Sequence, residues 1–269
     1  MDLYDRWARM VERPDERFAL DEAAMIIAAH IVPTTDVDVE LGRLDDLASE
    51  CPAGTLDDLA DLLFDRLGLR GDRQTYDDPR NSSIPEILDR RVGIPISLSV
   101  LMMEVGRRLG LNCEGVGMPG HFLLRHVGGG DQPDTLIDPF GAGRRLSVGA
   151  CRDMFSALQG SPSGWSPDLL NPTPPLAIVV RMLANLTTSY TRRDDLGGSR
   201  WVAELRAVLP ERSINQRLVV ASELAHTGAY SAAAEIVDTT AQRIAGVDDD
   251  NPDATRLRAH ARALRAQLN

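Results

Sequence analysis

Residues Gly93 to Pro139 decide the fold, and they read GIPISLSVLMMEVGRRLGLNCEGVGMPGHFLLRHVGGGDQPDTLIDP. The first part, Pro95–Leu109, is apolar on nearly all sides, which is typical of a buried helix, and Gly110 is expected to end it. Three short β-like runs follow the helix: Cys113–Met118, Phe122–Val127 and Thr135–Asp138. A buried helix followed by short strands predicts an α+β core with a small antiparallel sheet.

His121 and Asp138 are the two polar residues of this stretch that we expect to meet. Facing residues of a two-stranded hairpin have a constant sum of positions, and the midpoint of this pair lies between Gly129 and Gly130, inside the expected turn. The two side chains are therefore predicted to face each other, with Cβ atoms about 5 Å apart, within a slip of one or two residues. A hydrogen bond that only fixes the hairpin is favoured over a catalytic role.

Four motifs follow one another along the chain: Asp78–Ser82 (DPRNS), Leu88–Ser99 (LDRRVGIPISLS), Gly115–Arg125 (GVGMPGHFLLR) and Ile137–Phe140 (IDPF). Together they resemble the transglutaminase-like superfamily and, within it, a SirB-type branch of bacterial proteins. The resemblance implies a papain- or transglutaminase-like core that is preceded by helices and followed by an all-helical, tetratricopeptide-like domain.

The same resemblance implies a catalytic triad of a cysteine that opens the core helix, a histidine that begins a strand and an Asp-Pro pair. Pro95 aligns with the cysteine, His121 with the histidine and Asp138 with the aspartate. Proline has no nucleophilic group, and it has no backbone N–H to donate to an oxyanion. We therefore expect a vestigial site, in which His121 and Asp138 remain and thiol catalysis is lost.

Two serines and the three cysteines are the other candidate nucleophiles. Ser97 and Ser99 lie two and four positions after Pro95, and we interpret them as small polar residues of a packed helix. Cys113 is expected to be a buried structural thiol, and Cys51 and Cys151 have no neighbours in sequence that suggest chemistry.

The DPRNS motif contributes two further candidates. Arg80 and Asn81 are expected to line the entrance of the core helix, together with Ser97 and Ser99. No mechanism follows from these residue types alone.

The composition excludes several classes of function. All 29 basic residues are arginine, so neither Schiff-base chemistry nor a phosphate-loop lysine is available. The net charge of −11 argues against binding to nucleic acid or to an anionic membrane. His121 and His126 would point to opposite faces of a strand, and no HExxH spacing occurs. We therefore expect neither a metal nor another cofactor.

A cytoplasmic location is expected. The three cysteines are odd in number and far apart, which is typical of a reducing compartment. The N-terminal residues MDLYDRWARM lack the apolar core of a signal peptide. The most apolar windows, Ala23–Val32 and Leu176–Leu186, are short and are interrupted by His30 and Arg181, so no membrane span is expected.

Helical spacing defines the segments on both sides of the core. Before it, we predict the helices Leu20–Ile31, Val37–Leu47 and Leu56–Leu67. Asp36 and Thr55 are placed as N-caps, and Ser83–Glu86 reads as a capping box. After it, we predict the helices Leu176–Arg192, Ser199–Val208, Asn215–Thr227, Ser231–Ile244 and Pro252–Leu268.

The Pro- and Gly-rich stretch Gly160–Pro175 is the expected domain boundary. It separates a transglutaminase-like domain, residues 1–160, from a helical domain, residues 175–269. The helix pair within Leu218–Val237 resembles a tetratricopeptide repeat, and the pair before it resembles a degenerate copy.

The function predicted from these features is the binding of a protein or peptide by a non-catalytic, regulatory module. One alternative is a cysteine-independent hydrolase or amidase that uses His121 and Asp138 with another nucleophile or an activated water. A second alternative is a regulatory subunit whose site is completed by a residue of its partner. Neither nucleic acid nor a membrane is expected as a partner.

Overall fold

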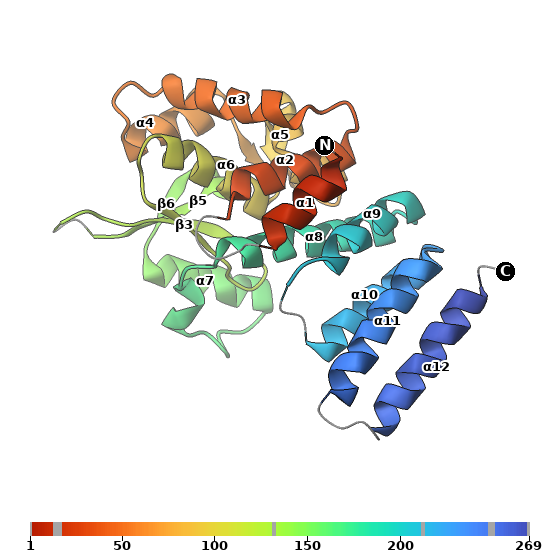
Figure 1. Cartoon of the computed structure of the whole chain (residues 1–269). Helices are drawn as coiled ribbons and strands as arrows, with labels where there is room; N and C mark the ends of the chain where they lie inside the picture. The colour runs from red at the N-terminus through yellow and green to blue at the C-terminus, as the bar shows by residue number, and fades with distance from the viewer. Residues whose placement is uncertain (1, 13–17, 131–132, 211–212, 247–250, 268–269) are drawn as a thin grey trace. The chain divides into compact units, whose positions relative to one another are not determined.

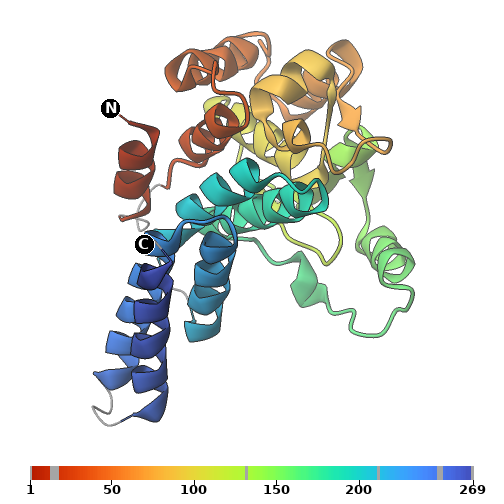
Figure 2. The same cartoon turned by 90° about the vertical axis from the view of Figure 1, so that its right-hand side faces the viewer.

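The computed structural model describes residues 2–12, 18–130, 133–210, 213–246 and 251–267. It divides into two compact units (Figures 1 and 2). We call Arg17–Met182 the core unit, and Met1–Glu16 together with Leu183–Asn269 the helical unit. The domain boundaries expected from sequence, 1–160 and 175–269, remain a prediction, and the compact units are divided at other residues.

The core unit combines helices with two small sheets. Its α-helices are α2 (Leu20–Ile31), α3 (Val37–Ser49), α4 (Leu56–Ala60), α5 (Ile84–Arg90), α6 (Pro95–Arg108), α7 (Val148–Gln159) and the first part of α8 (Pro175–Arg192). A π-helical segment, η1 (Asp61–Arg66), continues α4. The 3₁₀ turns are η2 (Pro79–Ser82), η3 (Pro139–Gly141) and η4 (Pro167–Leu170).

The main sheet is antiparallel and has the strand order β3-β4-β5-β6. Its strands are β3 (Cys113–Val116), β4 (Leu123–His126), β5 (Thr135–Asp138) and β6 (Arg144–Leu146). Two short strands, β1 (Arg70–Gly71) and β2 (Val92–Gly93), form a separate parallel pair. This architecture is the α+β core that the sequence predicts.

Helix α6 is the centre of the core unit, and every residue from Pro95 to Gly106 is buried. It contacts β3 and β4, and Figure 1 shows it on the opposite side of the sheet from α7. Because side chains alternate along a strand, Leu123 and Leu136 lie on the α7 face, where they pack with Cys151. The prediction of a helix buried on nearly all sides is confirmed.

The helices before α6 lie close to their predicted ranges, and both predicted caps form. The Asp36 carboxylate accepts hydrogen bonds from the N–H groups of Asp38 and Val39, and the Thr55 hydroxyl accepts one from Asp58. The capping box predicted at Ser83–Glu86 is wrong. Ser83 also ends η2, its side chain is fully buried, and it makes no capping hydrogen bond to α5.

The helical unit contains α1 (Leu3–Val11), the second part of α8 (Pro175–Arg192), α9 (Leu196–Ala207), α10 (Ile214–His226), α11 (Tyr230–Ala245) and α12 (Pro252–Ala266). Helix α1 was not predicted, although Trp7 is fully buried and its indole N–H donates to the carbonyl of Leu205. The last predicted helix extends to Leu268, which lies outside the described residues.

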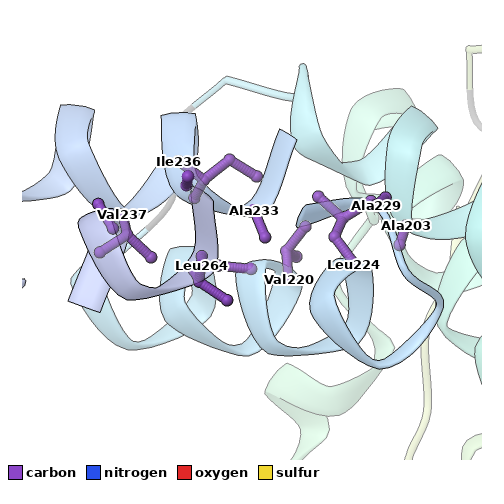
Figure 3. Close-up of a cluster of buried hydrophobic side chains, with 11 residues drawn as sticks. Ala203, Val220, Leu224, Ala229, Ala233, Ile236, Val237 and Leu264 are labelled. Atoms are coloured by element: carbon purple, nitrogen blue, oxygen red, sulfur yellow. The ribbon is translucent and has the colours of Figure 1, made fainter. Parts of the chain in front are cut away.

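Small apolar side chains fill the space between α10, α11 and α12, which lie side by side (Figures 2 and 3). The buried cluster consists of Ala203, Val220, Ala221, Leu224, Ala229, Ala233, Ala234, Ile236, Val237, Ala261 and Leu264. Because alanine lets helices approach closely, this composition suits pairs of tightly packed helices. None of the described helices is both long and apolar enough to cross a membrane.

Candidate functional site

The side chains of His121 and Asp138 form a buried pair. The Nε2 atom of His121 lies 2.8 Å from Oδ1 of Asp138, and the two residues are 8% and 3% exposed. Asp138 ends β5, whereas His121 belongs to the turn that precedes β4. The two residues therefore meet as predicted. Asp138 does so from the end of a strand and His121 from a turn.

The register of the hairpin differs from the midpoint estimate by two positions. Leu124 pairs with Ile137, so the residue opposite Asp138 in that register is Leu123 rather than His121. The last pair before the loop is His126 with Thr135, so the loop is centred one residue later than the midpoint estimate. The slip lies at the limit of the one or two residues allowed for it.

Arg181, from α8, holds the turn that bears His121. Its Nη2 donates to the carbonyl of Met118 at 2.9 Å and to the carbonyl of His121 at 2.6 Å. Its guanidinium also lies over the ring of Phe122, with Cζ 5.3 Å from the ring centre. In the sequence Arg181 interrupts an apolar window, and a lone charge in such a window is the signal of a buried polar contact.

Asp138 is held in its ionised form. Burial alone would raise its pKa, but the hydrogen bond and charge of His121, the Gly141 N–H and the charge of Arg144 outweigh burial and lower the pKa. An ionised carboxylate only accepts hydrogen bonds, so Nε2 of His121 is the donor. In a neutral imidazole this leaves Nδ1 with the free lone pair. The pair can therefore accept a proton at Nδ1.

Pro95 is the first residue of α6 and is buried. The residue before it, Ile94, donates its N–H to the carbonyl of Asn81 at 3.3 Å. Ser99 donates its hydroxyl to the carbonyl of Pro95 at 2.9 Å, which is a local helix contact. The hydroxyl of Ser97 is fully buried and has no hydrogen-bond partner among the described residues.

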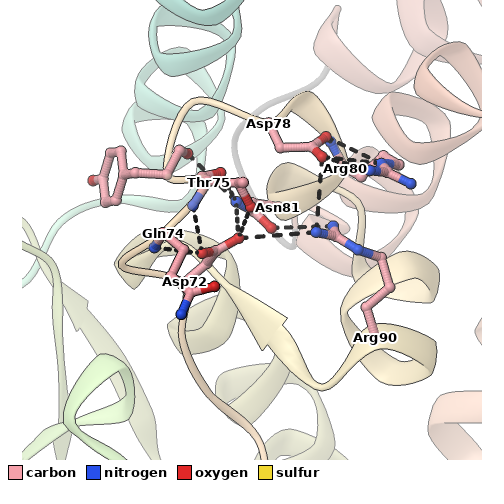
Figure 4. A network of polar contacts seen from close by, with 8 residues as sticks. Asp72, Gln74, Thr75, Asp78, Arg80, Asn81 and Arg90 are labelled. Atoms are coloured by element: carbon pink, nitrogen blue, oxygen red, sulfur yellow. Dashed lines mark hydrogen bonds and ion pairs between the residues drawn. The ribbon is translucent and has the colours of Figure 1, made fainter.

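The DPRNS motif belongs to a polar network that fixes the loop before η2 (Figure 4). Asn81 is fully buried and donates to the carboxylate of Asp72 at 3.0 Å and to the carbonyl of Thr75 at 2.7 Å. Arg90 donates to the side-chain oxygen of Asn81 at 3.1 Å. Arg80 is exposed and pairs with Asp78. A role of Arg80 and Asn81 in lining a site remains a prediction.

Asp72 is the acceptor at the centre of this network. Burial would raise its pKa, but hydrogen bonds from Thr75, Asn81 and Gln74 outweigh burial and lower the pKa to about 2. Asp72 therefore stays ionised and its charge is satisfied within the loop.

A pocket of about 500 Å³ adjoins these elements in the core unit. It is lined by Arg70, Gly71, Asp72, Arg73, Gln74, Val92, Phe140, Gly141 and Ala142. Val92 lies three residues before Pro95, and Phe140 lies two residues after Asp138. The ring of Phe140 also packs edge-on against the imidazole of His121, with ring centres 5.8 Å apart. The lining therefore includes residues near Pro95 and Asp138 in sequence, and Phe140 links the pocket to His121, although no predicted triad position is itself a lining residue.

None of the three cysteines is activated as a nucleophile, because a reactive thiol needs a lowered pKa. Burial raises the pKa of Cys113 to about 12. The pKa of Cys51 is raised by burial and by the charge of Asp58. The pKa of Cys151 is raised by burial and by the charge of Asp138, a neighbour that sequence reasoning missed. Among the described residues, no cluster of three or more His, Cys, Asp or Glu side chains could hold a metal ion.

Comparison with known proteins identifies a family and several relatives that are similar to this chain. A family model described as the transglutaminase-like superfamily matches residues 19–184. A UPF0162 protein of Xylella fastidiosa is 36% identical over 209 residues, which cover 71% of this chain and 72% of that protein. A UPF0162 protein of Pseudomonas aeruginosa is 37% identical over 177 residues, covering 62% of this chain and 63% of its own length.

A shorter similarity extends to animals. F-box only protein 21 of the mouse is 38% identical over 108 residues, which are 38% of this chain and 17% of that protein. No solved structure is significantly similar to the chain.

Proposed function

The chain belongs to the transglutaminase-like superfamily, and we propose that it is a non-catalytic member whose role is to bind a protein or peptide. The observation that supports this most directly is the proline at the first position of α6. In the triad implied by the family resemblance, this position belongs to the nucleophile. The finer assignment to a SirB-type branch is part of the same proposal.

Loss of the thiol removes two catalytic contributions at once. Pro95 has no group that can attack a carbonyl carbon, and its nitrogen has no hydrogen to donate to the resulting oxyanion. The fold tolerates the change, because proline suits the first turn of a helix. The raised pKa values of Cys51, Cys113 and Cys151 argue against a relocated thiol.

A binding role has support from both units. In the core unit, the pocket beside Phe140 has a volume within the range of small-ligand and side-chain sites. In the helical unit, the pair α10 and α11 resembles a tetratricopeptide repeat, and such pairs commonly present a groove to partners. The three free cysteines support a reducing compartment, the cytoplasm, as the place where the protein acts.

One observation favours a second candidate, a cysteine-independent hydrolase or amidase. The ionised Asp138 orients His121 so that Nδ1 can accept a proton, and that nitrogen could activate a water molecule or a hydroxyl. A third arrangement, in which a partner supplies the nucleophile to this pair, would make the chain a regulatory subunit.

Hydrolysis of acyl esters and peptide amides separates these functions. We expect no turnover above the rate of a heat-denatured control, and no change after alkylation of all three cysteines. The variants His121→Ala and Asp138→Asn should then be indistinguishable from the wild type. Turnover that His121→Ala abolishes in a folded protein would overturn the non-catalytic proposal in favour of the hydrolase. Turnover that is lost on alkylation would point to a thiol.

A further inference from the structure

The pocket beside Phe140 is positively charged although the chain as a whole is strongly negative, with a net charge of −11. We call it the Arg70/Arg73 pocket, after the two cations among its lining residues. We propose that this pocket binds a carboxylate side chain of an acidic peptide, an inference that deepens the proposed peptide-binding function and rests on it.

The two arginines lack the partners that most arginines of this unit have. Arg43, Arg66 and Arg108, for example, each pair with a carboxylate. Among the described residues, neither Arg70 nor Arg73 has a carboxylate within ion-pair distance. The chain has 40 acidic residues and 29 basic ones, so carboxylates outnumber the arginines that could pair with them. Two unpaired arginines at one pocket are therefore unexpected.

The one carboxylate in the pocket lining does not neutralise them. Asp72 is 6% exposed, and its oxygens accept hydrogen bonds from Gln74, Thr75 and Asn81. Asp72 also lies 3.9 Å from Nη2 of Arg90, which balances its negative charge, so the field inside the pocket is set by Arg70 and Arg73. An anionic group is therefore the ligand that the pocket favours.

Arg73 is held over an aromatic surface. Its Cζ lies 5.2 Å from the ring centre of Phe140, an arrangement of the cation–π type. Among the described residues, the N–H groups of Arg73 make no hydrogen bond, so they remain available to a ligand. The planar fork of those N–H groups matches a carboxylate.

Phe140 itself is fixed by close contacts. A Cβ atom on Gly71 would lie 2.6 Å from Cγ of Phe140, so the ring packs directly on the glycine backbone. Tyr76 and His121 contact the ring edge-on, with ring centres 6.2 Å and 5.8 Å away. The surface that supports Arg73 is thus pre-organised, which lowers the entropy lost when a ligand binds.

The location of the pocket favours a peptide as the bearer of the carboxylate. Val92 lies three residues before Pro95 and Phe140 two residues after Asp138, and the Phe140 ring contacts His121. A volume of about 500 Å³ accommodates one or two amino-acid side chains. A free phosphate would satisfy the same arginines, so the experiment includes it as a separate arm.

The test uses the full chain and two fluorescent octapeptides of glycine and serine, one with two adjacent glutamates and one with glutamines in their place. We expect fluorescence anisotropy to show the glutamate peptide binding roughly tenfold more tightly, as a charge-assisted contact implies. Arg73→Gln and Arg70→Gln should each weaken that binding several-fold and leave the weak glutamine peptide unchanged. Arg152→Gln, an exposed arginine on α7, is the matched control and should have no effect.

The outcomes separate this inference from the function on which it rests. Equal binding of both peptides would overturn the carboxylate site and leave peptide binding standing. Binding of the glutamate peptide that neither pocket substitution weakens would also overturn the site. A third outcome is that neither peptide binds, but inorganic phosphate or N-acetylglutamate raises the melting temperature of the wild type and not that of Arg73→Gln. The anion site then stands and peptide binding fails. No response to any probe overturns both.

Discussion

The imidazole of His121 and the carboxylate of Asp138 lie 2.8 Å apart, although the two residues are not opposite each other in the sheet. Asp138 pairs with Arg144 on β6, and His121 reaches it from the turn before β4. The geometry of the pair therefore depends on what holds that turn. Arg181 does so through two carbonyl groups, those of Met118 and His121.

The first prediction concerns this arginine. Arg181→Gln should lower the free energy of unfolding by about 2 kcal/mol, because two charge-assisted hydrogen bonds and the stacking on Phe122 are lost. Urea unfolding followed by circular dichroism measures the change. Arg152→Gln on the surface of α7 should unfold at the wild-type midpoint. An Arg181→Gln variant as stable as that control would show that the turn holds its own shape.

The second prediction follows from the lowered pKa of Asp72, which is about 2 in the folded protein and about 3.9 in an unfolded chain. A depressed carboxylate pKa stabilises the fold above pH 4, and this stabilisation is lost as the pH falls toward 2. Asp72→Asn should therefore cost about 2 kcal/mol at pH 7. The difference from wild type should shrink between pH 5 and pH 3.

Urea unfolding across that pH range tests the dependence. Asp153→Asn, an exposed residue of α7, is the control and should track the wild type at every pH. A difference between wild type and Asp72→Asn that stays constant with pH would mean that Asp72 acts by packing and not by its charge.

Local sequence patterns identified most of the helices and three strands of the main sheet, β3, β4 and β5. The limits of α2 match the prediction, because periodic apolar residues mark a helix along its whole length. Strand β6 was missed, since Arg144–Leu146 has no strand pattern and forms by pairing with β5. Helix α7 was also missed, although Ser147 caps it through the Ala150 N–H.

The same distinction applies to the candidate site. His121 and Asp138 could be predicted to meet because both belong to one hairpin region, in which spacing carries geometric information. Arg181 is 60 residues from His121 along the chain, and no local pattern links the two. The pocket of Arg70, Arg73 and Phe140 likewise joins distant segments. Such contacts depend on the tertiary fold and are absent from any short window of sequence.

The third prediction concerns Ser97, whose buried hydroxyl has no hydrogen-bond partner among the described residues. Ser97→Ala should leave stability unchanged or raise it by up to about 1 kcal/mol, because an unsatisfied polar group is removed. Ser99→Ala is the matched control. It should cost roughly 1 kcal/mol, since it removes the hydrogen bond to the carbonyl of Pro95. If Ser97→Ala abolishes a measurable hydrolysis while the fold persists, Ser97 is a nucleophile and the non-catalytic proposal is wrong.

The fourth prediction tests whether Pro95 occupies the position of the lost nucleophile. In Pro95→Cys, the new thiol would lie at the N-terminus of α6, where the helix dipole favours an anion. If this position faces Nδ1 of His121, the imidazolium adds a second stabilising charge. Both effects should lower the thiol pKa from about 8.5 to below 7. The pH dependence of iodoacetamide labelling at residue 95 measures it.

The native cysteines do not obscure this measurement, because burial raises the pKa of each, to about 12 for Cys113. The double variant Pro95→Cys with His121→Ala separates the two causes. The thiol pKa of the double variant should be about one unit or more higher than that of Pro95→Cys alone, because only the contribution of the helix dipole remains. An ordinary pKa near 8.5 that His121→Ala does not change would show that the His121–Asp138 pair faces elsewhere. In that case Pro95 does not occupy the position of a catalytic cysteine, and the His121–Asp138 pair is a structural contact.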